Sequence, residues 1–223
     1  MFSRFFKKKK TEENKPPFDM PIGLRINGLV RLNPSFETYF LLNQSKLGTI
    51  LPEDMECIIQ AISHFFIFGV DVYRASLNSS PPSVLKINVK SGEIADIIFF
   101  NRSHKFEVSV GTADYNSWIE AIGYKDIKTP NGVEYFRDWM GDVERYGDQV
   151  KPIMFSEKFC ESNNRAESSL STQAMLYSRI LDDVDIEYLL TSLVSSFDPR
   201  GNPQHVVEIW IGTVINQTYF EVF

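Results

Sequence analysis

The sequence predicts a single α+β domain, predominantly antiparallel β with few short helices. Of the 223 residues, 43% are hydrophobic and 13% aromatic, which is too apolar a composition for a disordered chain. Most apolar segments alternate with a period of two and are separated by turn residues, as expected for half-buried strands. A chain of this length buries roughly 70% of the surface that it exposes when unfolded. It therefore needs no disulfide or metal to stabilise a core.

The N-terminus differs in composition from the rest of the chain. Residues 1–20 are expected to form a flexible basic and aromatic arm with a Pro-containing linker, and residues 21–223 the globular domain. Residues 1–10 hold five of the 23 Lys and Arg and none of the 29 Asp and Glu, so they carry +5 and the remainder −11. An acidic body argues against nucleic acid as a partner, because binding phosphates requires a basic face.

Alternation and turn signals place the strands. They are expected, in chain order, at 24–32, 58–68, 71–77, 84–90, 94–100, 106–110, 132–140, 174–181, 187–197, 205–215 and 218–223. In VLKINVK, Leu85, Ile87 and Val89 are expected to face the core, and Lys86 and Asn88 the solvent. The following Ser-Gly pair supplies a hairpin turn.

Helix signals are fewer. Asp114 is a suitable N-cap for a helix over 115–122, which carries an apolar stripe and is followed by Gly123. A short helical turn is expected at 52–57, because Pro, Glu and Asp suit a first turn. The Ser-rich stretch 161–173 is expected to be a surface loop.

Two pairs of segments resemble each other. DVYRASL followed by VLKINV is similar to AMLYSRIL followed by EYLLTSL, and each pairs a strand that contains Tyr and Arg with an apolar strand. Two copies of a β-hairpin module would suit this chain length, but chance similarity between amphipathic strands is the simpler explanation.

Cysteine and histidine placement gives no metal or catalytic motif. Cys57 and Cys160 stand about a hundred residues apart without a CxxC pair, which fits buried thiols in a reducing compartment, although a single long-range disulfide stays open. His64 and His205 lie in apolar strands, where structural histidines are common, and His104 lies in a polar turn. No export signal, transmembrane segment, phosphate-binding loop or nucleophile elbow is present in the sequence. No cofactor is expected.

Acidic clusters are interpreted as solvated surfaces. Asp183, Asp185 and Glu187 would share one face of an extended segment at steps of about 6.5 to 7 Å. They could bind Ca²⁺ or Mg²⁺, but a solvated hairpin turn is the favoured interpretation because no glycine wraps the chain around an ion. A second group is expected to be an exposed rim: Asp138, Asp142, Glu144 and Asp148.

The aromatic residues divide into core and arm. Trp118, Trp139 and Trp210 lie in periodic apolar segments and are expected in the core. The arm residues lie beyond a proline linker, where no core is within reach, and are candidates for a membrane or partner contact: Phe2, Arg4, Phe5, Phe6, Lys7, Lys8, Lys9 and Lys10. A solvated tail without a role is the alternative.

The blocks PIGLRINGLV, LPED, WIEAIG, VEYFRDW, MLYSRIL and EYLLTSLV occur in this order. In this arrangement the chain resembles the YjfK-like family of bacterial proteins, a domain of unknown function. The resemblance implies an intracellular bacterial protein and supplies no catalytic residues.

The expected function is non-enzymatic: a cytoplasmic binding or adaptor protein whose arm contacts a protein partner or the anionic inner face of a membrane reversibly. Two alternatives remain open. One is an enzyme with a site in a cleft of the β domain, using His64 or His205 with a carboxylate. The other is a self-assembling subunit. The sequence does not indicate an oligomeric state.

Overall fold

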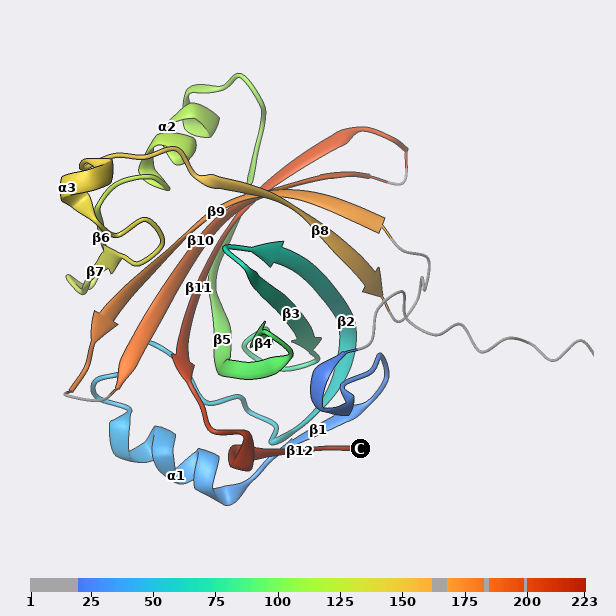
Figure 1. Cartoon of the computed structure of the whole chain (residues 1–223). Coiled ribbons are helices and arrows are strands. Elements are labelled where there is room, and N and C mark those ends of the chain that lie inside the picture. Colours follow the sequence, from blue (N-terminus) through green and yellow to red (C-terminus); the bar gives the residue numbers. More distant parts are fainter. Residues whose placement is uncertain (1–19, 162–167, 183–184, 199) are drawn as a thin grey trace, which may run out of the picture.

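The computed structural model describes residues 20–161, 168–182, 185–198 and 200–223, and this part of the chain consists mostly of antiparallel strands with three short α-helices (Figure 1). The predicted predominance of antiparallel β structure is confirmed. The sequence did not predict that the sheet closes on itself.

Eight of the strands form a closed antiparallel barrel. Their order is β2-β3-β4-β5-β11-β10-β9-β8, and β8 pairs back onto β2. The barrel strands are β2 (Glu56–Ile67), β3 (Val70–Leu77), β4 (Ser83–Lys90), β5 (Glu93–Val108), β8 (Ile153–Glu161), β9 (Ser168–Ile180), β10 (Ile186–Phe197) and β11 (Pro203–Val214). Shorter strands extend the sheet beside β2 and β9: β1 (Leu29–Leu32), β12 (Phe220–Val222), β6 (Asp126–Lys128) and β7 (Glu134–Arg137).

The barrel contains two four-stranded meanders, β2–β5 and β8–β11. The first strands of the two meanders, β2 and β8, pair with each other, and so do their last strands, β5 and β11. The similar sequence segments occupy matching places, because DVYRASL and VLKINV lie in β3 and β4, and AMLYSRIL and EYLLTSL in β9 and β10. These are the second and third strands of each meander. The similarity in sequence therefore has a structural counterpart.

Strand β4 is buried on both faces, which corrects the prediction made for VLKINVK. Leu85 and Ile87 face outward into a core beneath α1, whereas Lys86 lies on the barrel-facing side and is only 3% exposed. Asn88 follows it on the same side and is half-buried. Since other elements cover this strand on the outside and the barrel encloses it on the inside, neither of its faces contacts solvent. The alternation of its side chains therefore separates residues that face the outer core from residues that face the barrel interior.

Helix α1 (Pro34–Asn43) covers the outside of the first meander and was missed in the sequence. The Asn33 side chain caps it by accepting hydrogen bonds from two backbone N–H groups of the first turn, at 3.0 and 3.2 Å. Phe36 and Phe40 are buried, and the Phe36 ring meets Phe99 of β5 edge-on with centroids 5.1 Å apart. This helix and the β1–β12 pair close one outer core.

The second meander is covered by α2 (Ala113–Ala121) and β6–β7, with α3 (Val143–Tyr146) beside them (Figure 1). The predicted helix is confirmed, but its cap is Thr112, whose Oγ1 accepts from the Tyr115 N–H at 3.2 Å. Asp114 lies inside the first turn instead. Trp118, expected in the core, is only half-buried and packs against the core between this helix and the sheet.

Other sequence-based boundaries were wrong where strand pairing outweighs local composition. Residues 52–55 form no helical turn, and β2 begins at Glu56. The polar stretch 101–106 is no turn, since β5 runs through it paired with β11, with a bulge near its middle. In 24–32 only the last four residues form a strand, because Asn27 has a positive φ of 62°.

The expected surface loop 161–173 is also corrected. Strand β9 begins at Ser168 and pairs with β8 and β10, so ladder hydrogen bonds on both sides hold a Ser-rich segment in the sheet. Residues 162–167 lie outside the described residues.

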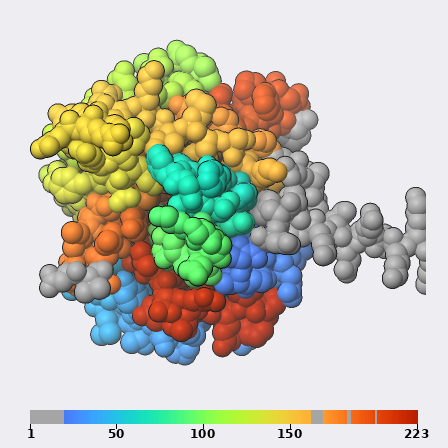
Figure 2. Space-filling model, viewed as in Figure 1, coloured from blue at the N-terminus to red at the C-terminus, as the bar shows by residue number. Residues whose placement is uncertain are grey.

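The two ends of the barrel differ. One end carries the turns β3–β4 and β10–β11, and the other carries β2–β3 and β4–β5. In the space-filling view, teal and green atoms from the β2–β5 region cover the middle of the visible face (Figure 2). The cavity described below opens at the end of the β3–β4 and β10–β11 turns.

Candidate functional site in the barrel mouth

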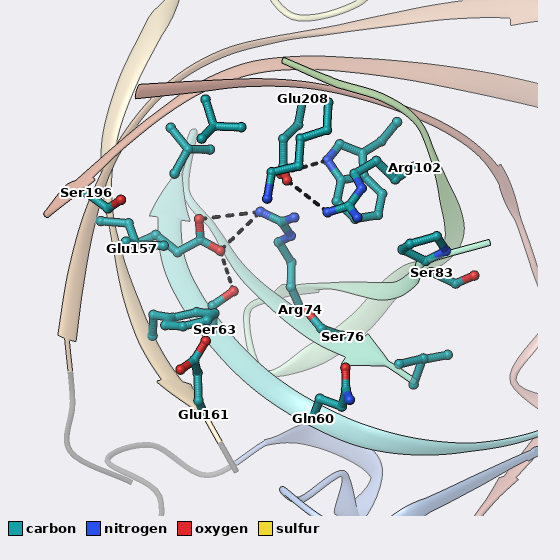
Figure 3. A pocket seen from close by; sticks show the side chains of 18 of the residues that line it. Gln60, Ser63, Arg74, Ser76, Ser83, Arg102, Glu157, Glu161, Ser196 and Glu208 are labelled. Atoms are coloured by element: carbon teal, nitrogen blue, oxygen red, sulfur yellow. Dashed lines mark hydrogen bonds and ion pairs between the residues drawn. The ribbon is translucent and has the colours of Figure 1, made fainter. Parts of the chain in front are cut away.

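A cavity of about 580 Å³ occupies one end of the barrel, and all eight barrel strands contribute to its lining (Figure 3). We call it the barrel mouth. Its size lies within the range of small-molecule sites, roughly 300 to 1,000 Å³. An eight-stranded barrel is just wide enough inside to be filled by side chains or to hold one small ligand.

The first ion pair in the mouth joins β3 to β8. Arg74 donates from Nη1 to Glu157 Oε1 at 3.2 Å and to Oε2 at 3.4 Å. Ser63 of β2 donates from Oγ to the same Oε1. Glu157 is almost completely buried, so its charge depends on these partners for compensation.

The second ion pair joins β5 to β11. Arg102 donates from Nη1 to Glu208 Oε1 at 3.3 Å, and the Trp210 indole N–H donates to Glu208 Oε2 at 3.2 Å. The guanidinium carbons of Arg74 and Arg102 lie 5.8 and 5.7 Å from the centroid of the Trp210 ring. The ring therefore has both cations as neighbours, at cation–π distance.

The walls of the mouth differ in polarity. The side formed by β2, β3 and β4 presents small polar groups, among them Gln60, Ser76 and Ser83. The opposite side, formed by β9, β10 and β11, presents Leu170, Val194 and Val206, with Ser196 and Gln204 nearer the β10–β11 turn. The mouth is therefore amphipathic in cross-section, with the ion pairs at its inner end (Figure 3).

Lys86 lies next to this cluster, directly opposite Arg74 in the β3–β4 ladder. The pKa of its ammonium is lowered to about 8, mainly by burial. Arg74 acts in the same direction, whereas Asp96 and Asp138 act in the opposite direction. The Lys86 side chain forms no hydrogen bond or ion pair with any other described residue. The barrel therefore holds a third, incompletely compensated cation.

The structure does not bring the three histidines together. His64 lies on the face of β2 opposite Ser63, 2.9 Å from Asp71 and tilted against Tyr73. His205 faces away from the mouth and contacts Ser195 Oγ at 2.9 Å. His104 is exposed, as expected, and stacks on Phe106.

The carboxylates expected to form a solvated turn have separate environments. Glu187 is fully buried, which corrects its assignment to the surface. Its carboxylate accepts from the Tyr135 hydroxyl at 2.7 Å, from the Gly48 and Thr49 N–H groups at 2.6 and 3.0 Å, and from Arg179 at 2.6 Å. These bonds fasten the segment after α1 to the outside of the barrel. Burial and the neighbouring carboxylate raise the pKa of Tyr135.

The other acidic residues predicted to lie at the surface differ in burial. Asp183 lies outside the described residues, and Asp185 is partly buried. The expected rim residues Asp138, Asp142, Glu144 and Asp148 are exposed. Within the part of the chain that the structure describes, no group of three His, Cys, Asp or Glu is placed to hold a metal ion.

The arm candidates fall outside the structure, since residues 1–19 are not among those described. This applies to Phe2, Arg4, Phe5, Phe6, Lys7, Lys8, Lys9 and Lys10. None of the described helices combines the length and apolar character needed to cross a membrane.

Sequence reasoning missed all four members of the two ion pairs. The available signal was a charge inside an otherwise apolar strand, as for Arg74 in DVYRASL and Glu208 in HVVEIWIG. Trp210 was correctly assigned to the interior, where it is 6% exposed. Its place at the inner end of a cavity could not be inferred from alternation.

Comparison with known proteins agrees with the resemblance seen in the sequence. Residues 1–221 match the model of a family described as a protein of unknown function, DUF2491. The chain belongs to this family. It is also 28% identical, over 224 residues and 99% of each chain, to a protein of Escherichia coli (strain K12) named uncharacterized protein YjfK. No solved structure shows a significant match. Since neither the family description nor the named relative assigns a site, the candidate site of this DUF2491 protein is identified from its own structure.

Proposed function

We propose that this protein is a non-enzymatic binding protein and that its ligand site is the barrel mouth. The observation that carries the proposal is an open cavity of about 580 Å³ whose inner end holds two ion pairs around one tryptophan. A barrel evolved only for stability would be expected to fill this space with apolar side chains, because buried ion pairs contribute little net stability. Retaining charge beside open space is typical of a binding site.

The composition of the mouth supports binding over catalysis. Among the described residues that line it there is neither histidine nor cysteine. The carboxylates of Glu157 and Glu208 are each engaged by an arginine, so neither is free to act on a bound ligand.

A mouth-blocking variant tests this proposal. Val194→Trp adds bulk to the apolar wall without removing a member of either ion pair. The neutral apolar dye N-phenyl-1-naphthylamine is titrated into the full-length protein, and its fluorescence gain is expected to be lost in this variant. Val110→Trp, at an exposed position outside the mouth, is the matched control and should bind as wild type. Equal binding by all three proteins would show that the mouth is not the site.

We further propose that residues 1–10 make a reversible contact with an anionic membrane surface on the cytoplasmic side. The charge separation between this segment, at +5, and the rest of the chain, at −11, favours such a contact. At about 1 kcal/mol per basic residue near an anionic leaflet, five residues supply roughly 5 kcal/mol before screening. This is enough for reversible binding and too little for permanent anchoring.

Liposome flotation tests the membrane contact. The full chain is expected to float with anionic vesicles and to stay unbound with neutral ones, and deletion of residues 1–10 should abolish flotation. Equal recovery on both vesicle types, or no effect of the deletion, would contradict this function. Binding of the arm to an acidic protein partner would appear as loss of a co-purifying protein on deletion without flotation of the full chain.

A further inference from the structure

We propose that the ligand of the barrel mouth is an amphipathic organic anion, with its oxyanion held by Arg74 and Arg102 and its apolar part lying against the β9–β11 wall. This inference rests on the proposed binding function and specifies the class of ligand.

The arginines have unused hydrogen-bond donors. Each guanidinium carries five N–H donors in a planar fork, but Arg74 and Arg102 form side-chain hydrogen bonds only through Nη1. Within the described chain, Nε and Nη2 of both residues have no acceptor. Both side chains are largely buried, at 15% and 28% exposure. None of these nitrogens is among the buried polar atoms that lack a partner, so they face the open space of the cavity. A carboxylate, sulfonate or phosphate oxygen placed there would match the fork geometry.

The acceptors of the cluster are already engaged. Both oxygens of Glu157 and both oxygens of Glu208 accept at least one hydrogen bond. Thr172 adds a further unused polar group, since the residue is 1% exposed and its buried hydroxyl has no partner among the described residues. It lies on the inward side of β9, between Leu170 and Ala174 and opposite Val194. The unmet hydrogen bonding is therefore mainly on the donor side, which favours a ligand that accepts.

The charges point to the same ligand class. Arg74 and Arg102 both lie within 6 Å of the Trp210 ring centroid, and Lys86 faces Arg74 across the β3–β4 ladder. The three cations repel one another in a medium of low dielectric constant. The carboxylates of Glu157 and Glu208 oppose this repulsion at the arginines, and those of Asp96 and Asp138 oppose it at Lys86. An anion between the guanidiniums would relieve the repulsion.

The rest of the ligand is expected to be apolar on one side. Val194 and Val206 are direct partners in the β10–β11 ladder, and Leu170 lies nearby on β9. The other wall is lined by neutral polar groups from β2, β3 and β4. An aromatic or aliphatic acid fits this division, with its apolar body against the valines and its charged end toward Trp210.

A pair of dyes with one skeleton tests the inference. 1-Anilinonaphthalene-8-sulfonate and N-phenyl-1-naphthylamine share the anilinonaphthalene skeleton, and only the first carries an anion. Wild-type full-length protein is expected to bind the sulfonate at least about 10-fold more tightly, the effect of one or two charge-assisted hydrogen bonds. Val194→Trp should abolish binding of both dyes, and decanoate should displace the sulfonate more effectively than decanol.

Variants separate the roles of the residues. Arg102→Gln combined with Glu208→Gln removes one guanidinium without leaving a carboxylate unpaired, and should reduce the preference for the sulfonate to about 3-fold or less. Arg74→Lys keeps the charge but removes the fork, and serves if the double variant does not fold. It should lower the preference several-fold. Arg145→Gln combined with Glu144→Gln, on α3 outside the barrel, is the matched control, because it also removes one cation and one anion, and it should behave as wild type.

The outcomes distinguish the two proposals. If wild type binds neither dye in the mouth, the binding function itself fails. If it binds both with equal affinity, and Val194→Trp abolishes both, the mouth is a binding site but the anion inference is overturned. A preference for the sulfonate that survives in folded Arg102→Gln/Glu208→Gln and in Arg74→Lys would also overturn it.

Discussion

Replacing Lys86 by methionine is expected to stabilise the protein at neutral pH. Methionine has a similar length and flexibility, so the barrel-facing position stays filled. The substitution removes an ammonium that belongs to a residue only 3% exposed and that forms no ion pair with a described residue, although Asp96 and Asp138 act on it electrostatically. The perturbation therefore isolates the cost of burying the charge.

The magnitude follows from the pKa of Lys86. Burial lowers this pKa from 10.5 to about 8, and each pKa unit corresponds to 1.36 kcal/mol, which gives about 3 kcal/mol at pH 7. Between pH 8 and pH 10.5 the unfolded chain binds more protons than the folded one at this site, so wild-type stability rises over that interval. Above it, lysine is neutral in both states and the advantage of methionine disappears.

Urea denaturation followed by circular dichroism measures the difference. Lys86→Met and wild type are compared at pH 7, 8, 9 and 10, and the gap in unfolding free energy should narrow from about 3 kcal/mol as the pH rises. Lys90→Met is the matched control, because Lys90 lies on the same strand and is exposed. It should change stability by about 0.5 kcal/mol or less.

Two results would refute the reasoning. A Lys86→Met protein that is less stable than wild type at pH 7 would show that the ammonium makes favourable interactions exceeding its desolvation cost. A stability difference that stays constant from pH 7 to pH 10 would show that the pKa of Lys86 is not lowered in the folded state.

Three further predictions concern packing and burial. Glu187→Gln should cost about 3 kcal/mol in unfolding free energy, since it breaks a buried ion pair, whereas Asp182→Asn at an exposed pair should cost no more than about 1 kcal/mol. Similar losses in chemical denaturation would contradict this distinction. Gly212→Ala would place a Cβ 2.5 Å from the Phe100 ring and should lower the free energy of unfolding by about 1–3 kcal/mol. An unchanged melting temperature would show that the ring can move aside without loss of stability. Cys57 and Cys160 are both buried, and they should react with Ellman's reagent only on unfolding; rapid labelling of folded protein would contradict their burial.

Period-two alternation and turn residues were sufficient to find most strands and the hairpin at Ser91-Gly92, where both residues have positive φ. These are local properties, since a turn that requires positive φ selects its residues wherever the chain lies. Helix α1 was missed although Asn33 and Pro34 mark its start, because its apolar residues do not form a regular stripe. The interruption at NRSHKF was wrong because long-range pairing with β11 keeps polar residues in a strand.

The candidate site was beyond sequence reasoning. Arg74, Arg102, Glu157 and Glu208 are spread over more than a hundred positions and meet only because β5 pairs with β11 and β8 with β2. Alternation shows that successive side chains point to opposite faces, but it cannot tell which face is a barrel interior. Lys86 shows this most directly, since the polar half of its strand faces the enclosed side.

The sequence by itself determined the mainly antiparallel β class, the positions of most strands and turns, the family resemblance, and the separation of a basic segment from an acidic body. These depend on local conformational preference, hydrophobic periodicity and composition. The closure of the barrel, the burial of Lys86 and Glu187, and the meeting of two ion pairs at Trp210 were decided by the tertiary structure. The physical reason is that hydrogen bonds between distant strands fix which side chains share an interior, and no short stretch of sequence contains that information.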